Sequence, residues 1–209
     1  LEDKLSKYLP EYENMTVRQA DGSIVPAKNP IYIHNLFSMT AGMDYVSYET
    51  RKRCLEENNG RCPTREFIRL LAEKPLVYEP GTSWLYSLAH DVIACLVEVI
   101  SGQNFNDYVT EHIFKPLGMT RSTYLPTQEE LDQIIPLYEF DNQIGEAKLL
   151  PKGNMYRYGP DYCSGGAGCV STVEDYMKFM EGLRTGKLLK PETVQLMQTD
   201  RLTEEQKKK

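Results

Sequence analysis

The strongest constraint on the fold is an apolar stretch between residues 87 and 101. Its apolar side chains recur at helical spacing, as Leu88, Val92, Cys95, Leu96 and Val99. Gly102 follows at the position where a left-handed residue commonly ends a helix. A helix that is apolar on most of its surface needs cover on several sides, so the sequence predicts a central helix in a helical layer.

Further helices are predicted from residues that favour helix starts and stops. The expected starts are Pro63-Thr64, Asn104, Thr127, Thr172 and Pro191. Thr127 and Glu130 also have the spacing of a capping box, in which each side chain bonds to the other residue's amide. The expected stops are Pro75, Lys115-Pro116 and Gly186.

Strand signals are fewer than helix signals in this chain. Two short hairpins are predicted, over residues 15–25 and 137–149, around Asp21-Gly22 and Asp141-Asn142. No internal repeat or low-complexity linker divides the sequence. We therefore expect residues 1–209 to form a single, mainly α (α+β) domain with small β-hairpins, ending in a polar tail, 202–209, that frays.

The charge pattern limits the possible partners. The net charge is −6 at pH 7, and the basic residues are scattered, which argues against nucleic acid as a partner. No apolar run approaches the roughly 18–20 residues that cross a bilayer, so no membrane span is predicted. The first residues show neither an initiating Met nor a signal-peptide pattern. We interpret the sequence as an internal piece of a longer protein, and it does not indicate a compartment.

Cysteine and histidine spacings give no metal motif. The five cysteines are Cys54, Cys62, Cys95, Cys163 and Cys169. Free thiols are the simplest interpretation, and Cys54 with Cys62 is the one local pair that could close a disulfide. The three histidines, His34, His90 and His112, are far apart and lie in no metal-binding motif. No metal and no organic cofactor are therefore predicted.

A serine becomes a nucleophile only when a base or a lowered pKa activates it. The G-x-S-x-G and S-x-x-K motifs that hold such a base are both absent, so no nucleophile is predicted within this chain. The glycine-rich stretch 164–168 lacks the lysine of a P-loop, and a tight turn explains its glycines equally well. Arg184-Thr185-Gly186 is similar to K-T-G, but it ends a predicted helix instead of lying on a strand.

Five segments, in order, resemble the serine β-lactamase and penicillin-binding protein superfamily, specifically its class C-like branch of D-alanyl-D-alanine peptidases and carboxyl esterases. They are LEDKLSKYLPEY, IYIHNLFSMTAGM, PGTSWLYSLAHDVIACLVEVISG, FKPLGMTRSTY and GGAGCVSTVEDYMKFMEGLRTGKLL. The resemblance covers nearly the whole chain. It implies an α/β domain built from the two chain ends, with a mostly helical domain inserted between them. This chain resembles the inserted helical domain, without the S-x-x-K and K-T-G or H-x-G segments.

The resemblance assigns Tyr86 to the tyrosine of the family's Y-x-N motif, which acts as general base or proton relay beside the nucleophile. A phenol has an ordinary pKa of about 10, so it accepts a proton near neutrality only where cations lower that pKa. In the family those cations are lysines of the two missing segments. We therefore expect Tyr86 to be a neutral phenol in this chain, while Ser87 beside it caps the following helix.

Other positions bear on the substrate. Leu88 stands where the family has an asparagine that hydrogen-bonds an acyl-amide, which favours an ester or peptide-like substrate over a β-lactam. Gly165 and Gly166 are expected to line the substrate cleft with Leu88. Met39 and Ala41 depart from the family's H-T-S-G and are interpreted as packing positions.

Two functional hypotheses follow. In the first, the chain is part of a serine hydrolase that acts on a small-molecule or peptide-like acyl substrate, and it is inactive alone. In the second, it is a non-catalytic module that recognises a peptide or a piece of cell wall. Under either hypothesis, an apolar patch uncovered on the excised domain would promote self-association.

Overall fold

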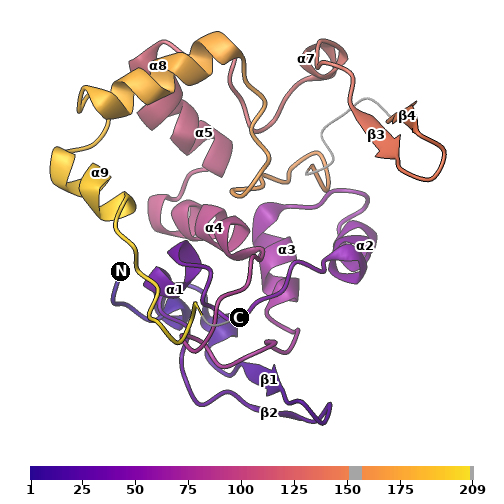
Figure 1. The fold of residues 1–209 in the computed structure, drawn as a ribbon, viewed down its shortest axis with the longest axis vertical. Coiled ribbons are helices and arrows are strands. Elements are labelled where there is room, and N and C mark those ends of the chain that lie inside the picture. The colour runs from indigo at the N-terminus through magenta and orange to yellow at the C-terminus, as the bar shows by residue number, and fades with distance from the viewer. Residues whose placement is uncertain (151–156, 208–209) are drawn as a thin grey trace.

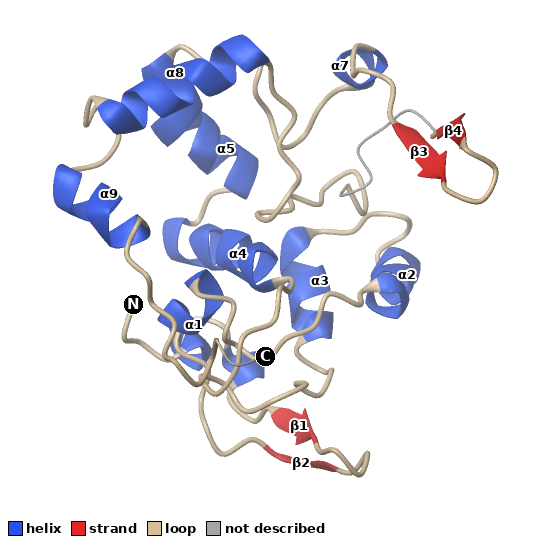
Figure 2. Cartoon of the chain, viewed as in Figure 1, coloured by secondary structure: helices blue, strands red, loops and turns tan. Residues whose placement is uncertain are grey.

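The computed structural model describes residues 1–150 and 157–207. Its helices are α1 (Ile33–Phe37), α2 (Tyr48–Glu57), α3 (Thr64–Leu71), α4 (Ala89–Ser101), α5 (Phe105–Val109), α6 (Lys115–Leu117), α7 (Gln128–Asp132), α8 (Val173–Arg184) and α9 (Pro191–Met197). Short 3-10 helices span Leu5–Lys7 and Pro10–Tyr12, and a π-helical turn, Thr110–Phe114, joins α5 to α6. Two antiparallel pairs complete the fold: β1 (Thr16–Arg18) with β2 (Ile24–Pro26), and β3 (Tyr138–Asp141) with β4 (Glu146–Leu149). Figures 1 and 2 show helices through most of the body and the strands at its edges.

Helix α4 is the centre of the fold, as its sequence predicts. It packs against α1, α3 and α5, and Figure 1 shows it between them. Val92, Cys95 and Leu96 lie in the buried core. The helix begins at Ala89, two residues later than the expected start at Ser87, and it ends at Gly102 with a φ of 70°. Its N-cap is Leu88 and not Ser87, so the predicted capping position is one residue too early.

The side chains predicted to start helices make the expected local bonds. The Asn104 side chain accepts from the amide of Asn106, and the Thr172 side chain accepts from the amide of Asp175. Thr127 and Glu130 form the predicted capping box at α7. These starts could be predicted because both partners lie within three residues.

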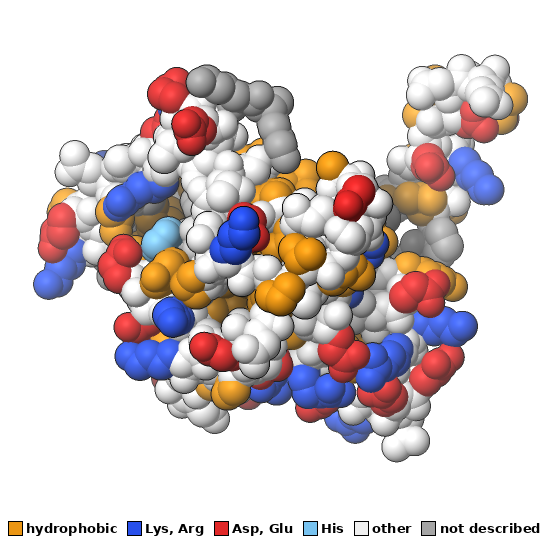
Figure 3. Space-filling model, turned by 90° about the horizontal axis from the view of Figure 1, so that it is seen from below, with side chains coloured by type: hydrophobic (Ala, Val, Ile, Leu, Met, Phe, Trp, Pro, Cys, Tyr) orange, Lys and Arg blue, Asp and Glu red, His pale blue; other side chains and the backbone are white. Residues whose placement is uncertain are grey.

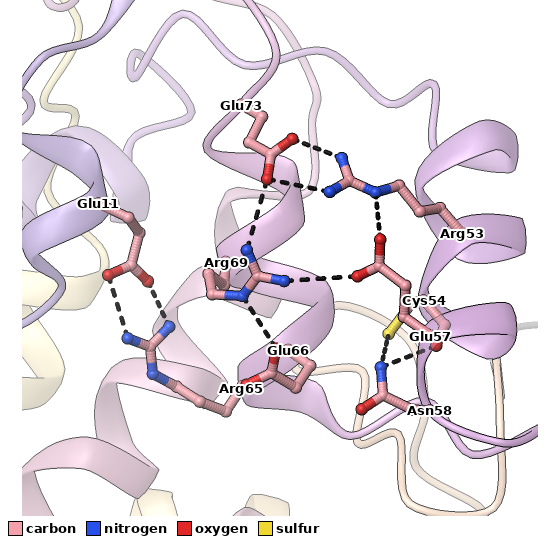
Figure 4. Close-up of polar contacts among 9 residues, drawn as sticks. All are labelled: Glu11, Arg53, Cys54, Glu57, Asn58, Arg65, Glu66, Arg69 and Glu73. Carbon is pink, nitrogen blue, oxygen red and sulfur yellow. Dashed lines mark hydrogen bonds and ion pairs between the residues drawn. The ribbon is translucent and has the colours of Figure 1, made fainter.

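The predicted helices do not include α2, whose sequence YETRKRCLEE offers little apolar surface. Only Thr50 and Cys54 are buried along it. Ion pairs attach it to α3 and to the turn after α3: Arg69 on α3 lies 3.6 Å from Glu57, and Arg53 pairs with Glu73 in the turn. Figure 4 shows these carboxylates and guanidinium groups alternating between the two helices. Helix α2 is therefore held by ion pairs with other segments, and a local sequence pattern does not reveal such contacts.

Both predicted hairpins are present, but their surroundings differ. In the first, Val17 is buried and pairs with Val25. In the second, Phe140 pairs with Ala147, and every residue of β3 and β4 is exposed. Figure 1 shows this second hairpin projecting from the body. A two-stranded hairpin has little stability by itself, so this element depends on its attachment to the body.

The buried apolar residues form two clusters. The larger contains Phe67, Leu88 and Val92, and the smaller consists of Val109, Phe114, Leu117 and Met119 beneath α8. Met39 and Ala41 lie in the larger cluster, in agreement with their interpretation as packing positions. Within the two described ranges, no helix combines the length and apolarity that crossing a bilayer requires.

The two ends of the described chain pack on neighbouring parts of the body. The amide of His34 donates to the carbonyl of Leu1 at 3.1 Å. The side chain of Gln206 donates to the carbonyl of Gly81 at 2.6 Å, and Lys207 pairs with Asp200 at 2.7 Å. The tail, predicted to fray, therefore contacts the segment that leads to Tyr86.

Candidate active site

Tyr86 lies on a segment that is tied by backbone hydrogen bonds to residues 39–44. The bonds run from Val77 N to Gly42 O (2.8 Å), Gly81 N to Thr40 O (2.8 Å), Leu85 N to Met39 O (3.1 Å) and Leu88 N to Asp44 O (3.3 Å). Backbone bonds thus fix the chain on both sides of Tyr86. The position of its phenol relative to α4 is set by this pairing.

Two unusual backbone conformations support the pairing. Met39 has a φ of 57°, in the left-handed region that residues other than glycine seldom adopt. Its carbonyl accepts from both Leu85 N and the Tyr78 hydroxyl, each at 3.1 Å. Gly42 has a φ of 83°, and a Cβ there would overlap the carbonyl oxygen of Tyr78. Strained backbone of this kind often gathers at functional sites.

The Tyr86 side chain is 51% exposed, and its ring centroid lies 5.4 Å from that of Tyr45, at an interplanar angle of 32°. Trp84 and Leu85 are also partly exposed, so aromatic and aliphatic surface continues along the segment. Ser87, in contrast, is buried. Its hydroxyl accepts from Ala89 N at 3.3 Å and contacts the Met39 sulfur at 3.6 Å. Ser87 therefore supports the first turn of α4 although it is not the N-cap.

The glycine loop packs against the start of α4. A Cβ on Gly165 would overlap the carbonyl oxygen of His90 and lie 2.8 Å from the Cβ of Ala94. A Cβ on Gly166 would lie 3.2 Å from a carboxylate oxygen of Asp91. The structure thus brings Gly165 and Gly166 to the first turns of the helix that follows Tyr86. The glycines are needed because helix and loop touch there.

Asp91 joins the loop to α4, and the sequence reasoning did not identify it. It is 3% exposed and accepts a 2.7 Å hydrogen bond from the Tyr162 hydroxyl. Burial raises the pKa of Asp91, whereas hydrogen bonds from Ser164 and Tyr162 act to lower it. The sequence signal for Asp91 was a carboxylate in the first turn of a mostly apolar helix.

Leu88 differs in position from the other predicted site residues. Its side chain is 2% exposed and belongs to the larger core cluster. Tyr86 is on the surface, and Gly165 and Gly166 contact α4, but Leu88 points into the packed interior. Among the described residues, no three His, Cys, Asp or Glu side chains gather in a way that could hold a metal ion.

The sequence that forms this site was compared with known protein families. The family model described as Beta-lactamase matches residues 1–208. The chain therefore belongs to the β-lactamase family, and the resemblance to the serine β-lactamase and penicillin-binding protein superfamily is confirmed.

Relatives of the chain include esterases and acyltransferases. Esterase EstB of Burkholderia gladioli is 29% identical over 93% of this chain and 53% of its own length. The LovD6 mutant of simvastatin synthase from Aspergillus terreus superposes with a TM-score of 0.76, at 26% identity, over 99% of this chain and 52% of its own. EstCE1, a hydrolase with promiscuous acyltransferase activity, gives 0.71 at 28% identity, over 95% and 56%. The chain spans about half the length of the curated relatives it matches.

Proposed function

We propose that the chain is the inserted helical domain of a larger serine hydrolase of the β-lactamase family, and that Tyr86 is its general base. The observation that carries the proposal is a half-exposed tyrosine, fixed by backbone bonds immediately before α4, in a chain of this family. Relatives named as esterases and acyltransferases support an acyl-transfer reaction.

The nucleophile would come from sequence outside these 209 residues, since no S-x-x-K motif occurs within them. The chain spans about half the length of the curated relatives it matches, so a protein of their length has room for such sequence. Figure 3 shows hydrophobic side chains across the middle of the face seen from below, where such sequence could pack.

The chemistry assigned to Tyr86 is proton transfer. Its phenolate would take the proton from the serine Oγ as that oxygen attacks the acyl carbon, and the resulting phenol would protonate the leaving group. Water or an alcohol would then release the acyl group from the serine. A phenol serves as this base only where neighbouring cations lower its pKa. The isolated chain is therefore inactive under this proposal.

The burial of Leu88 limits the kinds of substrate that the proposed site can hold. A leucine side chain has no hydrogen-bonding group, and this one faces the core, so it cannot hold an acyl-amide as an asparagine would. We assign the full-length protein an ester substrate in preference to a β-lactam, because an ester has no amide for such a side chain to hold.

A second candidate function is recognition without catalysis. The exposed aromatic surface of Tyr45, Trp84 and Tyr86 favours it, because aromatic faces pack well against peptides and sugars. The sequence of the full-length protein distinguishes the two candidate functions. A binding module would lack S-x-x-K or the K-T-G or H-x-G strand, and the hydrolase would contain both.

The direct test compares the full-length protein with this chain on an aryl ester and a chromogenic β-lactam. We expect serine-dependent turnover of the ester by the full-length protein and none by the chain. Serine-dependent turnover by the chain alone would overturn the assignment of the nucleophile to outside sequence. Binding of peptide or cell-wall fragments with no ester turnover by the full-length protein would favour the second candidate.

A further inference from the structure

Two buried cysteines meet where the chain passes from α2 into α3. Cys54 lies on α2, and Cys62 lies two residues before α3 begins at Thr64. Both side chains are 0% exposed and belong to the larger core cluster. Both are free thiols, and they hydrogen-bond to each other. The structure thus places two reduced sulfur atoms in contact inside the core.

The segment between the two cysteines folds back tightly. The amide of Asn58 donates to the carbonyl of Cys54 at 3.1 Å, and the amide of Gly60 donates to the carbonyl of Leu55 at 2.8 Å. Asn59 and Gly60 have φ values of 53° and 78°, the left-handed conformation that commonly follows a helix end. The side chain of Asn58 also donates to the Cys54 carbonyl at 2.9 Å, with its nitrogen 3.8 Å from the Cys54 sulfur (Figure 4). Backbone and side-chain bonds of this turn therefore hold the thiols together.

Cys62 is also fixed by the segment that precedes the glycine loop. A Cβ on Gly159 would lie 2.6 Å from the Cβ of Cys62 and 2.8 Å from its backbone nitrogen. The guanidinium group of Arg61 donates to the carboxylate of Asp161 at 2.8 Å. Residues 61 and 62 are thus packed on residues 159–161, which keeps the Cys62 sulfur next to α2.

Helix α2 can open locally more easily than α3. Only Thr50 and Cys54 are buried along α2, and its ion pairs to Arg69 and Glu73 are exposed. Exposed ion pairs contribute little stability, and an element with few buried contacts opens at a low cost in free energy. Opening of α2 would expose Cys54 to a dissolved oxidant although the closed structure buries it.

We propose that Cys54 and Cys62 form a dithiol site that a low-molecular-weight disulfide, such as oxidised glutathione, converts into an intramolecular disulfide. The Cys54 thiolate attacks one sulfur of oxidised glutathione, which forms a mixed disulfide and releases one glutathione thiolate. The Cys62 thiolate then attacks the Cys54 sulfur of the mixed disulfide, which forms the Cys54–Cys62 bond and releases the second glutathione. Two protein thiols are oxidised, one glutathione disulfide is reduced to two thiols, and the two protons pass to them.

The geometry favours closure over a lasting mixed disulfide. An S–S bond is about 2 Å long, so thiols that are already in hydrogen-bonding contact close it with small rotations of their side chains. Burial raises the pKa of both thiols, so the reaction should be slow in the folded protein. Once formed, the bond joins α2 covalently to the start of α3, where exposed ion pairs otherwise provide the link.

The test incubates the full-length protein, and this chain in parallel, with oxidised glutathione and blocks the remaining thiols with iodoacetamide before digestion. Trypsin cuts after Arg53, Arg61 and Arg65, so the two cysteines fall in separate peptides, 54–61 and 62–65. Mass spectrometry should find these two peptides joined by a disulfide in most of the protein, and a reducing agent should separate them. This measurement uses the native sequence, so it does not depend on how a variant folds.

Thermal unfolding gives a second measurement. The oxidised native protein should melt about 5 °C or more above its reduced form, because the cross-link restricts the unfolded chain. Cys54→Ser should melt at the same temperature under both conditions. Cys169→Ser, which removes the exposed thiol, should keep the linked peptides and the shift.

Linked peptides 54–61 and 62–65 together with a higher melting temperature support the proposal. Recovery of both peptides as alkylated thiols would overturn it. So would glutathione that stays bound to Cys54, a bond from Cys54 to a different cysteine, or an oxidised protein that melts no higher than the reduced one.

Discussion

The hydroxyl of Tyr162 donates a 2.7 Å hydrogen bond to the buried carboxylate of Asp91, 71 residues away in the sequence. Asp91 lies in the first turn of α4, and Tyr162 begins the loop that carries Gly165 and Gly166. This bond joins the helix after Tyr86 to the glycine loop. The candidate site is thus held together by a buried polar contact as well as by apolar packing.

Removing this acceptor should destabilise the fold. Asp91→Ala leaves the buried Tyr162 hydroxyl without its partner, so the free energy of unfolding should fall by about 1–3 kcal/mol. Urea unfolding of the chain measures this change. Glu56→Ala, at an exposed position on α2, is the control and should change stability by less than about 0.5 kcal/mol. Equal stability of the two variants would contradict the role given to Asp91.

The carboxyl group of Asp91 should also make the stability of the fold depend on pH. Burial raises the pKa of Asp91 above its ordinary value of 3.8. The stability that this group contributes is therefore fully present below about pH 3.8 and is lost as the pH rises through the folded-state pKa. Asp91→Asn removes the titration, so the stability of the native chain relative to Asp91→Asn should decrease as the pH rises above about 3.8. A relative stability that increases over this range would contradict the prediction.

The contacts of the glycine loop predict which of two glycine substitutions lowers the stability more. Gly165→Ala forces a Cβ into the backbone of His90, whereas Gly166→Ala meets only the end of the Asp91 side chain. Gly165→Ala should cost about 1–3 kcal/mol of unfolding free energy, and Gly166→Ala should cost less. Thermal unfolding of both variants provides the measurement. A larger loss for Gly166→Ala would mean that the loop does not pack on α4 as described.

The thiols should react slowly in the folded chain. All five cysteines are free, and only Cys169 is exposed. Burial raises the pKa of Cys95 and that of Cys163 to about 12 each. Because the thiolate is the reactive form and the reagent must reach it, Cys169 should account for the labelling with Ellman's reagent at about pH 8 in the folded chain. Cys169→Ser should remove the native-state labelling, and rapid labelling of several thiols without denaturant would contradict the burial.

Sequence reasoning predicted the parts of this fold that depend on neighbouring residues. The capping box of Thr127 and Glu130 and the stop of α4 at Gly102 are local features, and the structure has both. Helix α2 escaped prediction because its ion pairs reach Arg69 on α3 and Glu73 in the turn after α3. Within the candidate site, the family pattern supplied Tyr86, Gly165 and Gly166.

The burial of Leu88 and the bond between Asp91 and Tyr162 depend on packing between distant segments. A single sequence cannot give such contacts, because nothing in the local pattern specifies which segments meet. Asp91 was not among the predicted site residues, and no local pattern identifies Tyr162 as its partner.

The central claim is that Tyr86 transfers the proton in the complete enzyme. Tyr86→Phe in the full-length protein removes the hydroxyl and keeps the ring that lies against Tyr45. Steady-state hydrolysis of an aryl ester should show kcat reduced by about 100-fold or more, with KM changed little. Tyr138→Phe, on the exposed β3 strand, should retain native kcat. A Tyr86→Phe enzyme with kcat close to that of the native protein would contradict the account.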